Sequence, residues 1–132
     1  MKKILIVGMV LLGFLTVNAQ TNSTPAQVDI AKVLKFTNDN YDMGKIAFGK
    51  STEFTVSIQN ISNYNISLDN VMVGCGCTTP KYTKDQVILP GATATVVLGF
   101  NGSAMGMFSK SATLFFSGSL TKAVSFHGEG VH

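Results

Sequence analysis

The sequence predicts an all-β protein, built as an antiparallel β-sandwich of about seven strands. Three observations support this class. Apolar and polar residues alternate with a period of two, turn-forming residues recur between the alternating segments, and no segment after Ala19 keeps a helical period. Because successive side chains of a strand point to opposite faces, each alternating segment indicates a half-buried strand. Short strands separated by turns pack most economically as two antiparallel sheets.

The apolar phase of the alternating segments predicts the core. Four such segments are clear, at 54–58, 94–100, 112–116 and 124–126. The side chains expected to be buried are Phe54, Val56, Ile58, Val96, Leu98, Leu114, Phe116, Val124 and Phe126. Met72 lies in a further apolar stretch and is also expected to belong to the core.

Turn-forming residues separate these segments. Glycine, proline, asparagine and serine favour tight turns, whereas none of the separating stretches has the pattern of a helix cap. The turns are predicted at Gly44, Gly49-Lys50, Asn60 to Asn65, Pro90-Gly91, Asn101-Gly102 and Ser117-Gly118-Ser119.

The N-terminal residues predict export. Lys2 and Lys3 form a basic region, residues 4–17 are almost all apolar, and Ala19 is the small residue that signal peptidase requires before its cut. The apolar run is shorter than the roughly 20 residues that span a bilayer. We therefore expect cleavage after Ala19 and a soluble product, secreted or periplasmic, with no stable membrane anchor.

This cleavage site divides the chain into three expected parts. Residues 1–19 are a signal peptide, residues 20–32 a flexible leader rich in Asn, Ser, Thr and Pro, and residues 33–132 the β-sandwich domain. Removing 19 of the 132 residues leaves 113. That length is enough for one domain with a single core and too short for two comfortable ones.

The charge of the expected mature chain excludes one class of partner. The sequence has ten lysines, no arginine and seven acidic residues. Without Lys2 and Lys3, eight lysines face seven acids, so the formal net charge is only +1. No lysine cluster remains, and a basic cluster is what nucleic-acid binding requires. We expect no nucleic-acid partner.

No arrangement typical of catalysis is evident. The sequence contains no Ser-His-Asp pattern, no phosphate-cradling glycine loop and no metalloprotease helix. Four carboxylates could act as acids or bases: Asp42, Glu53, Asp69 and Asp85. Their spacing in the sequence does not place any two of them together as an acid and base pair. His127 falls on the polar phase of the last alternating segment and is expected at the surface. We therefore expect that the protein is not an enzyme.

Cys75 and Cys77 are the most informative residues, because they are the only cysteines and flank a single glycine, Gly76. Side chains at i and i+2 share one face of an extended segment, and glycine lets the backbone bend. This geometry fits a small-ring disulfide, a two-thiolate metal clip or a structural loop. The sequence leaves these three possibilities open.

Each chemical possibility has its own logic. Exported cysteine pairs are usually oxidised, but a ring closed across one residue stabilises little, and a fully extended i to i+2 spacing is near the upper limit for a disulfide. A strained bond would favour thiol exchange, although no lysine, histidine or helix N-terminus is evident beside Cys75 to lower its thiol pKa. Two thiolates in a bent loop would select Cu(I), whereas structural zinc requires four ligands and only His127 and His132 could complete the set. Met105 and Met107 flank Gly106 in a predicted loop and remain open as copper thioethers.

Several segments in order resemble the signatures of an exported bacterial Cys-Gly-Cys-Thr family, domain of unknown function 1573. They are Tyr41-Asp42-Met43-Gly44-Lys45-Ile46, Gln59-Asn60, Cys75-Gly76-Cys77-Thr78-Thr79-Pro80, Leu89-Pro90-Gly91 and Gly106-Met107-Phe108-Ser109-Lys110. The resemblance covers about Phe36 to Val131. It implies an immunoglobulin-like fold akin to Hydin-type domains and pilus-chaperone sandwiches, and it brings no established activity. The cysteine segment is also similar to that of copper-delivery proteins with a Cys-X-Cys motif on an immunoglobulin-like fold.

Two functions follow as hypotheses. The leading one is a noncatalytic extracytoplasmic binding or adaptor module, whose exposed edge strands recruit an unknown protein partner and which needs no cofactor. The alternative is a thiol site at Cys75 and Cys77 that handles Cu(I) or exchanges disulfides.

Overall fold

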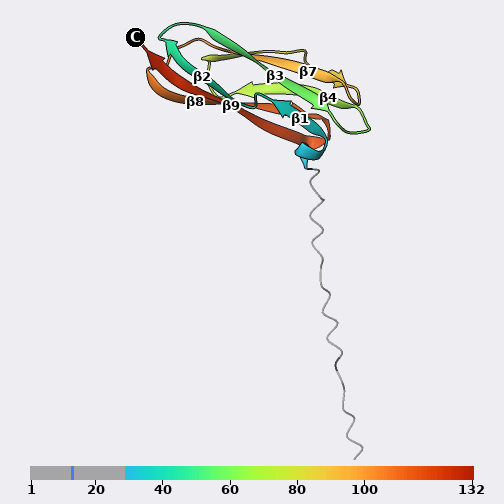
Figure 1. The fold of residues 1–132 in the computed structure, drawn as a ribbon. Helices are drawn as coiled ribbons and strands as arrows, with labels where there is room; N and C mark the ends of the chain where they lie inside the picture. The colour runs from blue at the N-terminus through green and yellow to red at the C-terminus, as the bar shows by residue number, and fades with distance from the viewer. Residues whose placement is uncertain (1–12, 14–28) are drawn as a thin grey trace, which may run out of the picture.

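The protein was analysed as a computed structural model, which describes residue 13 and residues 29–132. The predicted signal peptide, 1–19, and the leader up to residue 28 lie outside the described residues, apart from Gly13. The described chain forms two β-sheets packed face to face and contains no α-helix, which confirms the predicted all-β sandwich (Figure 1). In residues 13 and 29–132, no helix is long and apolar enough to cross a membrane.

Four strands form the first sheet and five form the second. The first has the order β1-β3-β7-β5, comprising β1 (Leu34–Thr37), β3 (Thr52–Asn60), β7 (Thr93–Phe100) and β5 (Thr78–Lys81). The second has the order β2-β9-β8-β4-β6, comprising β2 (Asn40–Ala47), β9 (Leu120–Val131), β8 (Gly106–Phe116), β4 (Ile66–Val73) and β6 (Gln86–Ile88). All pairs are antiparallel except β2 with β9, which is parallel. Two 3-10 turns, η1 (Ile30–Lys32) and η2 (Ser117–Ser119), complete the described fold.

The described chain therefore has nine strands rather than the predicted seven or so. The difference reflects strands that are too short to show a period in sequence. β5 has four residues, one of them Pro80, and β6 has three. A period-two pattern needs at least four or so alternating positions to be distinguished from chance. These two short strands form because β5 pairs with β7 and β6 pairs with β4. Such pairing depends on the tertiary structure and leaves no local pattern in the sequence.

The core lies between the two sheets and confirms the predicted phases. All nine side chains named as buried are inaccessible or nearly so. Aromatic rings bridge the sheets: Phe54 and Phe100 from the first sheet contact Phe126 of the second, with ring centroids 5.4 and 5.8 Å apart. Phe100 also stacks on Phe108 at 4.7 Å. These contacts add to the burial of apolar area that stabilises a sandwich.

The prediction that Met72 belongs to the core is wrong. Its residue is 57% exposed, whereas its neighbour Val71 is buried. The register between β4 and β8 shifts between Leu68 and Asn70, so an extra residue is inserted at that point. A β-bulge of this kind reverses which face the following side chains occupy. Leu68 and Val71 therefore both point inward, and Met72 points to solvent.

The turn predicted at Gly44 is also a bulge. Gly44 lies inside β2, where the register with β9 shifts between Asp42 and Lys45. Its φ of +67° is in the left-handed region, which glycine adopts without steric cost. The Asp42 carboxylate accepts a hydrogen bond from the Gly44 N–H at 2.8 Å and closes the local loop. A single glycine therefore marks a kink in an edge strand rather than its end.

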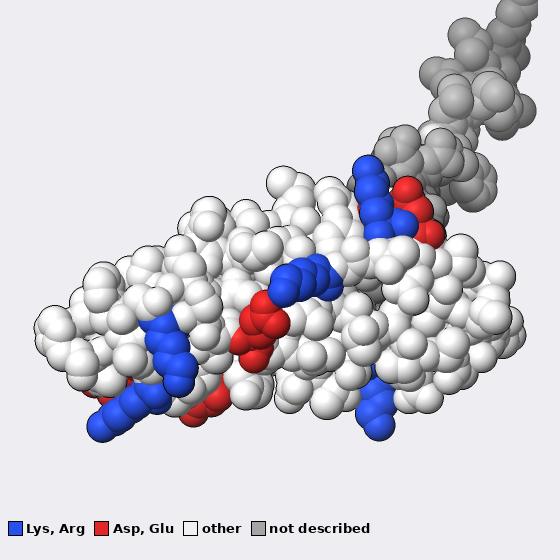
Figure 2. Space-filling model, turned by 90° about the horizontal axis from the view of Figure 1, so that it is seen from above, with Lys and Arg blue, Asp and Glu red and all other residues white. Residues whose placement is uncertain are grey.

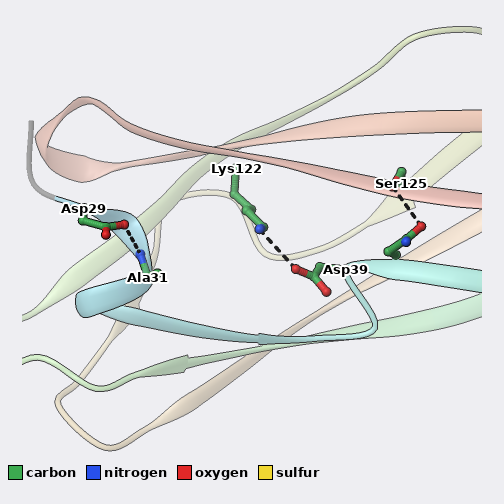
Figure 3. Close-up of polar contacts among 6 residues, drawn as sticks. Asp29, Ala31, Asp39, Lys122 and Ser125 are labelled. Carbon is green, nitrogen blue, oxygen red and sulfur yellow. Dashed lines mark hydrogen bonds and ion pairs between the residues drawn. The ribbon is translucent and has the colours of Figure 1, made fainter.

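The start of the folded domain is held by polar contacts, one within η1 and one to β9 (Figure 3). Asp29 caps η1 by accepting a hydrogen bond from the Ala31 N–H at 3.1 Å. Lys122 of β9 forms an ion pair with Asp39 at 3.1 Å, next to the point where the chain crosses from β1 to β2. The apolar side chain of Ile30 packs against the core. The last three residues of the predicted leader are thus part of the folded domain.

Charged groups are sparse on the surface. On the face drawn in Figure 2, lysine and acidic side chains are few among other residues, and some touch a side chain of opposite charge. Only three ion pairs are found in residues 29–132, namely Lys81 with Glu53, Lys122 with Asp39, and His127 with Asp42. This distribution agrees with the low net charge calculated from the sequence.

Candidate functional site

The two cysteines lie in the connection that crosses from one sheet to the other. β4 ends at Val73 in the second sheet, and β5 begins at Thr78 in the first. Cys75 and Cys77 are joined by a disulfide, and their Cα atoms are 5.3 Å apart. That separation is within the usual range for disulfides, so the i to i+2 spacing brings the sulfurs together as expected. A functional role for the pair remains a prediction.

Main-chain hydrogen bonds hold this connection in place, and we call residues 74–77 the cysteine loop. Gly74 donates its N–H to the Ser111 carbonyl of β8 at 3.4 Å. Thr78 donates to the Cys75 carbonyl at 3.3 Å, and Asn101 donates to the Cys77 carbonyl at 3.0 Å. The loop is therefore attached to both sheets through its backbone.

Gly76 does not have the role that the sequence suggested. Gly76 does not have a positive φ, and a Cβ built on it would meet no atom within 4 Å. The bend that joins the sulfurs is therefore accessible to other residues. The loop turns through its Thr78-to-Cys75 hydrogen bond rather than through a backbone conformation reserved for glycine.

The two sulfur atoms have different surroundings. Cys75 lines a surface pocket, whereas Cys77 packs against the hydrophobic core. The Cys77 Sγ lies 3.7 Å from the Thr78 Oγ1, and Thr78 is buried. Both cysteines are partly exposed, but a reagent that enters the pocket would meet Cys75, because Cys75 lines the pocket and Cys77 does not.

The pocket beside Cys75 is shared between the cysteine loop and β8. Its volume is about 210 Å³, and its lining residues are Gly74, Cys75, Thr78, Ser109, Lys110 and Ser111. This volume is several times the roughly 30 Å³ that one water molecule occupies in the liquid. The pocket can hold a side chain as well as water.

Lys110 is the residue in this pocket that sequence reasoning missed. No lysine is evident beside Cys75 in the sequence, but in the structure Lys110 lines the same pocket. The pairing of β4 with β8 brings Lys110 there across 34 residues of intervening chain. Lys110 lies on the core-facing phase of β8, between Phe108 and Ala112, and is only half-buried because the pocket opens at that point. Sequence could have marked it only as a lysine on the apolar phase of a strand.

β8 has an open edge next to the pocket. β9 pairs with β8 from Gly106 to Phe116, but β4 pairs with it only from Ala112 to Phe116. Beyond the Gly74 to Ser111 hydrogen bond, the chain turns away into the cysteine loop. Within residues 29–132, the segment Gly106–Lys110 is thus paired on one side only.

The main-chain groups at this edge point outward from the sheet. The Ser111 carbonyl faces Gly74 on the β4 side. Because successive residues of a strand direct their N–H and C=O groups alternately to the two sides, those of Ser109 and Met107 face the same side. No hydrogen bond to them from another segment is found in the described chain. Met107 is 79% exposed, so this edge is accessible to solvent.

The remaining candidate residues do not assemble into a catalytic or metal site. β2, β9 and β8 align Asp42, His127 and Ser109 in one cross-strand row. The His127 Nε2 lies 3.9 Å from an Asp42 carboxylate oxygen, but no hydrogen bond between His127 and Ser109 is present. A nucleophile and its base need that hydrogen bond. In the described residues, no group of three or more His, Cys, Asp and Glu side chains could hold a metal ion.

Comparison with known proteins identifies the family. The family model described as "Protein of unknown function (DUF1573)" matches residues 34–129, which is most of the chain. This chain belongs to that family. The resemblance seen in the sequence motifs is therefore confirmed at the level of the family, which carries no described activity. No match is found among curated proteins.

Solved structures support the fold alone. A protein of unknown function from Porphyromonas gingivalis aligns over 74% of this chain with 15% identity and a TM-score of 0.62. The PapD-like domain 7 of human CEP192 aligns over 82% with 11% identity and a TM-score of 0.60. The secreted serine protease VesC of Vibrio cholerae aligns over 77% with 17% identity and a TM-score of 0.62.

These neighbours differ greatly in length from this chain. The alignment spans 92% of the CEP192 domain, but only 46% of the Porphyromonas protein and 24% of VesC. At these identities the similarity is one of fold, and PapD-like and immunoglobulin-like sandwiches serve many functions. Function must therefore be argued from the residues of this chain.

Proposed function

We propose that this domain is a noncatalytic extracytoplasmic binding module, which receives an extended segment of a partner protein along the open edge of β8. The observation that carries the proposal is the row of main-chain groups at Met107 and Ser109, which are free of hydrogen bonds from the described chain. An extended peptide can satisfy such groups by adding a strand to the sheet. Export is inferred from Lys2, Lys3 and the apolar run that follows them.

The other edges are less suited to a partner strand. β1 and β6 have four and three residues, which offer few hydrogen bonds. β2 is interrupted by the bulge at Gly44, and β5 contains Pro80, which has no N–H to donate. The open part of β8 contains no proline, and the vacant position beside it lies in line with β4. It is the edge at which one more strand would extend an existing ladder.

The test uses a synthetic peptide as the probe, Ser-Val-Thr-Val-Thr, titrated into the mature protein labelled with ¹⁵N. We expect saturable amide shifts at Met107 and Ser109, with smaller shifts along β1 and β6. Ser109→Pro removes an N–H that faces the open side and should weaken binding about fivefold or more, because one hydrogen bond contributes roughly 1 kcal/mol. Ser109→Ala keeps the N–H and is the matched control. Shifts confined to another edge, or equal affinity for both variants, would contradict the proposal.

The second candidate function is the thiol site, favoured by the pocket that places Lys110 beside Cys75. For disulfide exchange the disulfide itself is the reactive group. For Cu(I), the pair must first be reduced to two thiolates, which are the soft ligands that this ion prefers. Anaerobic titration of the reduced protein with Cu(I), with Cys75→Ser/Cys77→Ser as the control, tests the copper arm. One tightly bound Cu(I) per chain, lost in the double variant, would support it, whereas equal weak binding by both proteins would exclude it.

A further inference from the structure

The open edge of β8 and the disulfide meet at one point. The pocket that Cys75 lines is also lined by Ser109 and Ser111, which belong to the end of the open edge. Gly74 occupies the position opposite Ser111, directly before the cysteine loop. A strand added beside Met107 and Ser109 would therefore run in line with β4, antiparallel to β8, with its N-terminal end against Cys75.

The charge in the pocket favours an anion. Lys110 makes none of the ion pairs found in residues 29–132, so no carboxylate in the described chain neutralises it. A nearby cation stabilises a thiolate relative to the neutral thiol. A cysteine side chain that enters this pocket would meet both the cation and the Cys75 sulfur.

We propose that the edge and the disulfide form a single capture site, at which an extended peptide segment is bound covalently through its own cysteine. The inference rests on the proposed function and specifies the class of partner. Four residue steps separate Met107 from Ser111, or about 13 Å along a strand. The segment is thus four to five residues long, with the cysteine at the end nearest Gly74.

The reaction is a thiol–disulfide exchange. The partner's thiol loses its proton to water, and the resulting thiolate attacks the Cys75 Sγ. A new disulfide forms between the partner and Cys75, while the bond to Cys77 breaks and its electron pair leaves on the Cys77 Sγ, which takes up a proton from water. One disulfide replaces another, so no oxidant or reductant is consumed.

The surroundings of the two sulfurs determine which is attacked. Cys75 lines the pocket, whereas Cys77 packs against the core. The departing Cys77 sulfur lies 3.7 Å from the Thr78 Oγ1, whose hydroxyl can donate to a thiolate. Cys77 stays two residues away from the new bond, and its return attack on Cys75 releases the peptide. The capture is therefore reversible.

The first experiment compares rates of mixed-disulfide formation with the intact oxidised protein, followed by intact mass. The probes are free cysteine, the peptide Cys-Val-Thr-Val-Thr, and two N-methylated forms of this peptide, methylated at alternate residues in either phase. We expect the peptide to react about tenfold or more faster than free cysteine, because binding at the edge raises the effective concentration of its thiol. One of the two N-methylated peptides should react no faster than free cysteine, and the other should react as fast as the unmethylated peptide. The reason is that only one of the two alternating sets of peptide N–H groups faces β8. Equal rates for all four probes would overturn the inference.

The second experiment assigns the sulfurs and the cation. With the peptide supplied as its own disulfide, Cys77→Ser should capture it through the remaining Cys75 thiol, and Cys75→Ser should react about tenfold more slowly because Cys77 faces the core. Lys110→Gln should slow capture about threefold or more, whereas Lys84→Gln, an exposed lysine outside the pocket, should not. Faster capture by Cys75→Ser, or an equal effect of both lysine variants, would refute the assigned roles. The N-methylated peptides need no change in the protein and remain decisive if a variant fails to fold.

The serine peptide of the preceding section separates the two proposals. If it binds at β8 but the cysteine peptide reacts no faster than free cysteine, the capture site is wrong and the binding module stands. If it does not bind at β8, the proposed function itself is wrong at this edge.

Discussion

Replacing Asn60 with aspartate is expected to destabilise the fold strongly, although the two side chains have almost the same shape. Asn60 is completely buried at the end of β3. Its amide nitrogen donates to the Tyr64 carbonyl at 2.7 Å and to the Ile88 carbonyl at 2.8 Å. Its amide oxygen accepts from the Ser62 N–H at 2.9 Å and from the Ser62 hydroxyl at 2.6 Å. The side chain thus joins β3, the following turn and β6.

The magnitude follows from this geometry. An aspartate leaves no cavity, so the change is confined to hydrogen bonding and charge. The carboxylate cannot donate to the two carbonyls, and each lost hydrogen bond costs roughly 1 kcal/mol. It also places a negative charge against two carbonyl oxygens in a buried position, where an unpaired charge is unfavourable. We expect a loss of about 3 kcal/mol or more at pH 7, relative to the original chain.

Urea unfolding of the oxidised protein, monitored by circular dichroism, measures this loss, and Asn63→Asp on the exposed side of the same turn is the matched control. Burial raises the pKa of the introduced carboxyl above that of an unfolded aspartate, which is about 3.9. Between these two pKa values the folded state binds more protons, so the stability of the variant falls as pH rises. The penalty should therefore be smallest at low pH. A penalty below about 1 kcal/mol at pH 7, or one that does not grow with pH, would refute this account of Asn60.

Three further predictions test the core, the cysteine loop and the signal peptide. Leu98→Ala should cost about 2 to 5 kcal/mol in urea unfolding because it leaves a cavity, whereas Met72→Ala should stay within about 0.5 kcal/mol; comparable losses would mean that the strand phases are wrong. Gly76→Ala should keep the disulfide and nearly all stability, as measured by intact mass and urea unfolding, because a Cβ there meets nothing within 4 Å. Gly130→Ala should instead destabilise by about 1 to 3 kcal/mol or more, since its Cβ would overlap a neighbouring main-chain carbonyl; the reverse order would contradict the loop geometry. Intact mass of the protein recovered from outside the cytoplasm should begin at Gln20, and full-length chain in the inner membrane would disprove the signal peptide.

The sequence determined the class of fold and most of the core. Alternation is a local property, because it depends only on the direction of successive side chains along one strand. Residues such as Val56, Leu98 and Leu114 could therefore be assigned to the core before their neighbours were known. The spacing of Cys75 and Cys77 put a disulfide within reach, but a fully extended loop would have left it near the geometric limit, so the bend of the loop had to come from the structure.

Tertiary structure decided which strands pair, and the character of the candidate site follows from that. The bulge before Val71 turns Met72 outward, and no local pattern announces it. The position of Lys110 beside Cys75 and the open edge at Ser109 both arise because β8 is longer than the part of it that β4 covers. Periodicity fixes the face to which a side chain points. Which distant strands pair depends instead on which arrangement of all the strands best buries their apolar faces in one core. The residues of the site are thus visible in the sequence, whereas their meeting is a property of the fold.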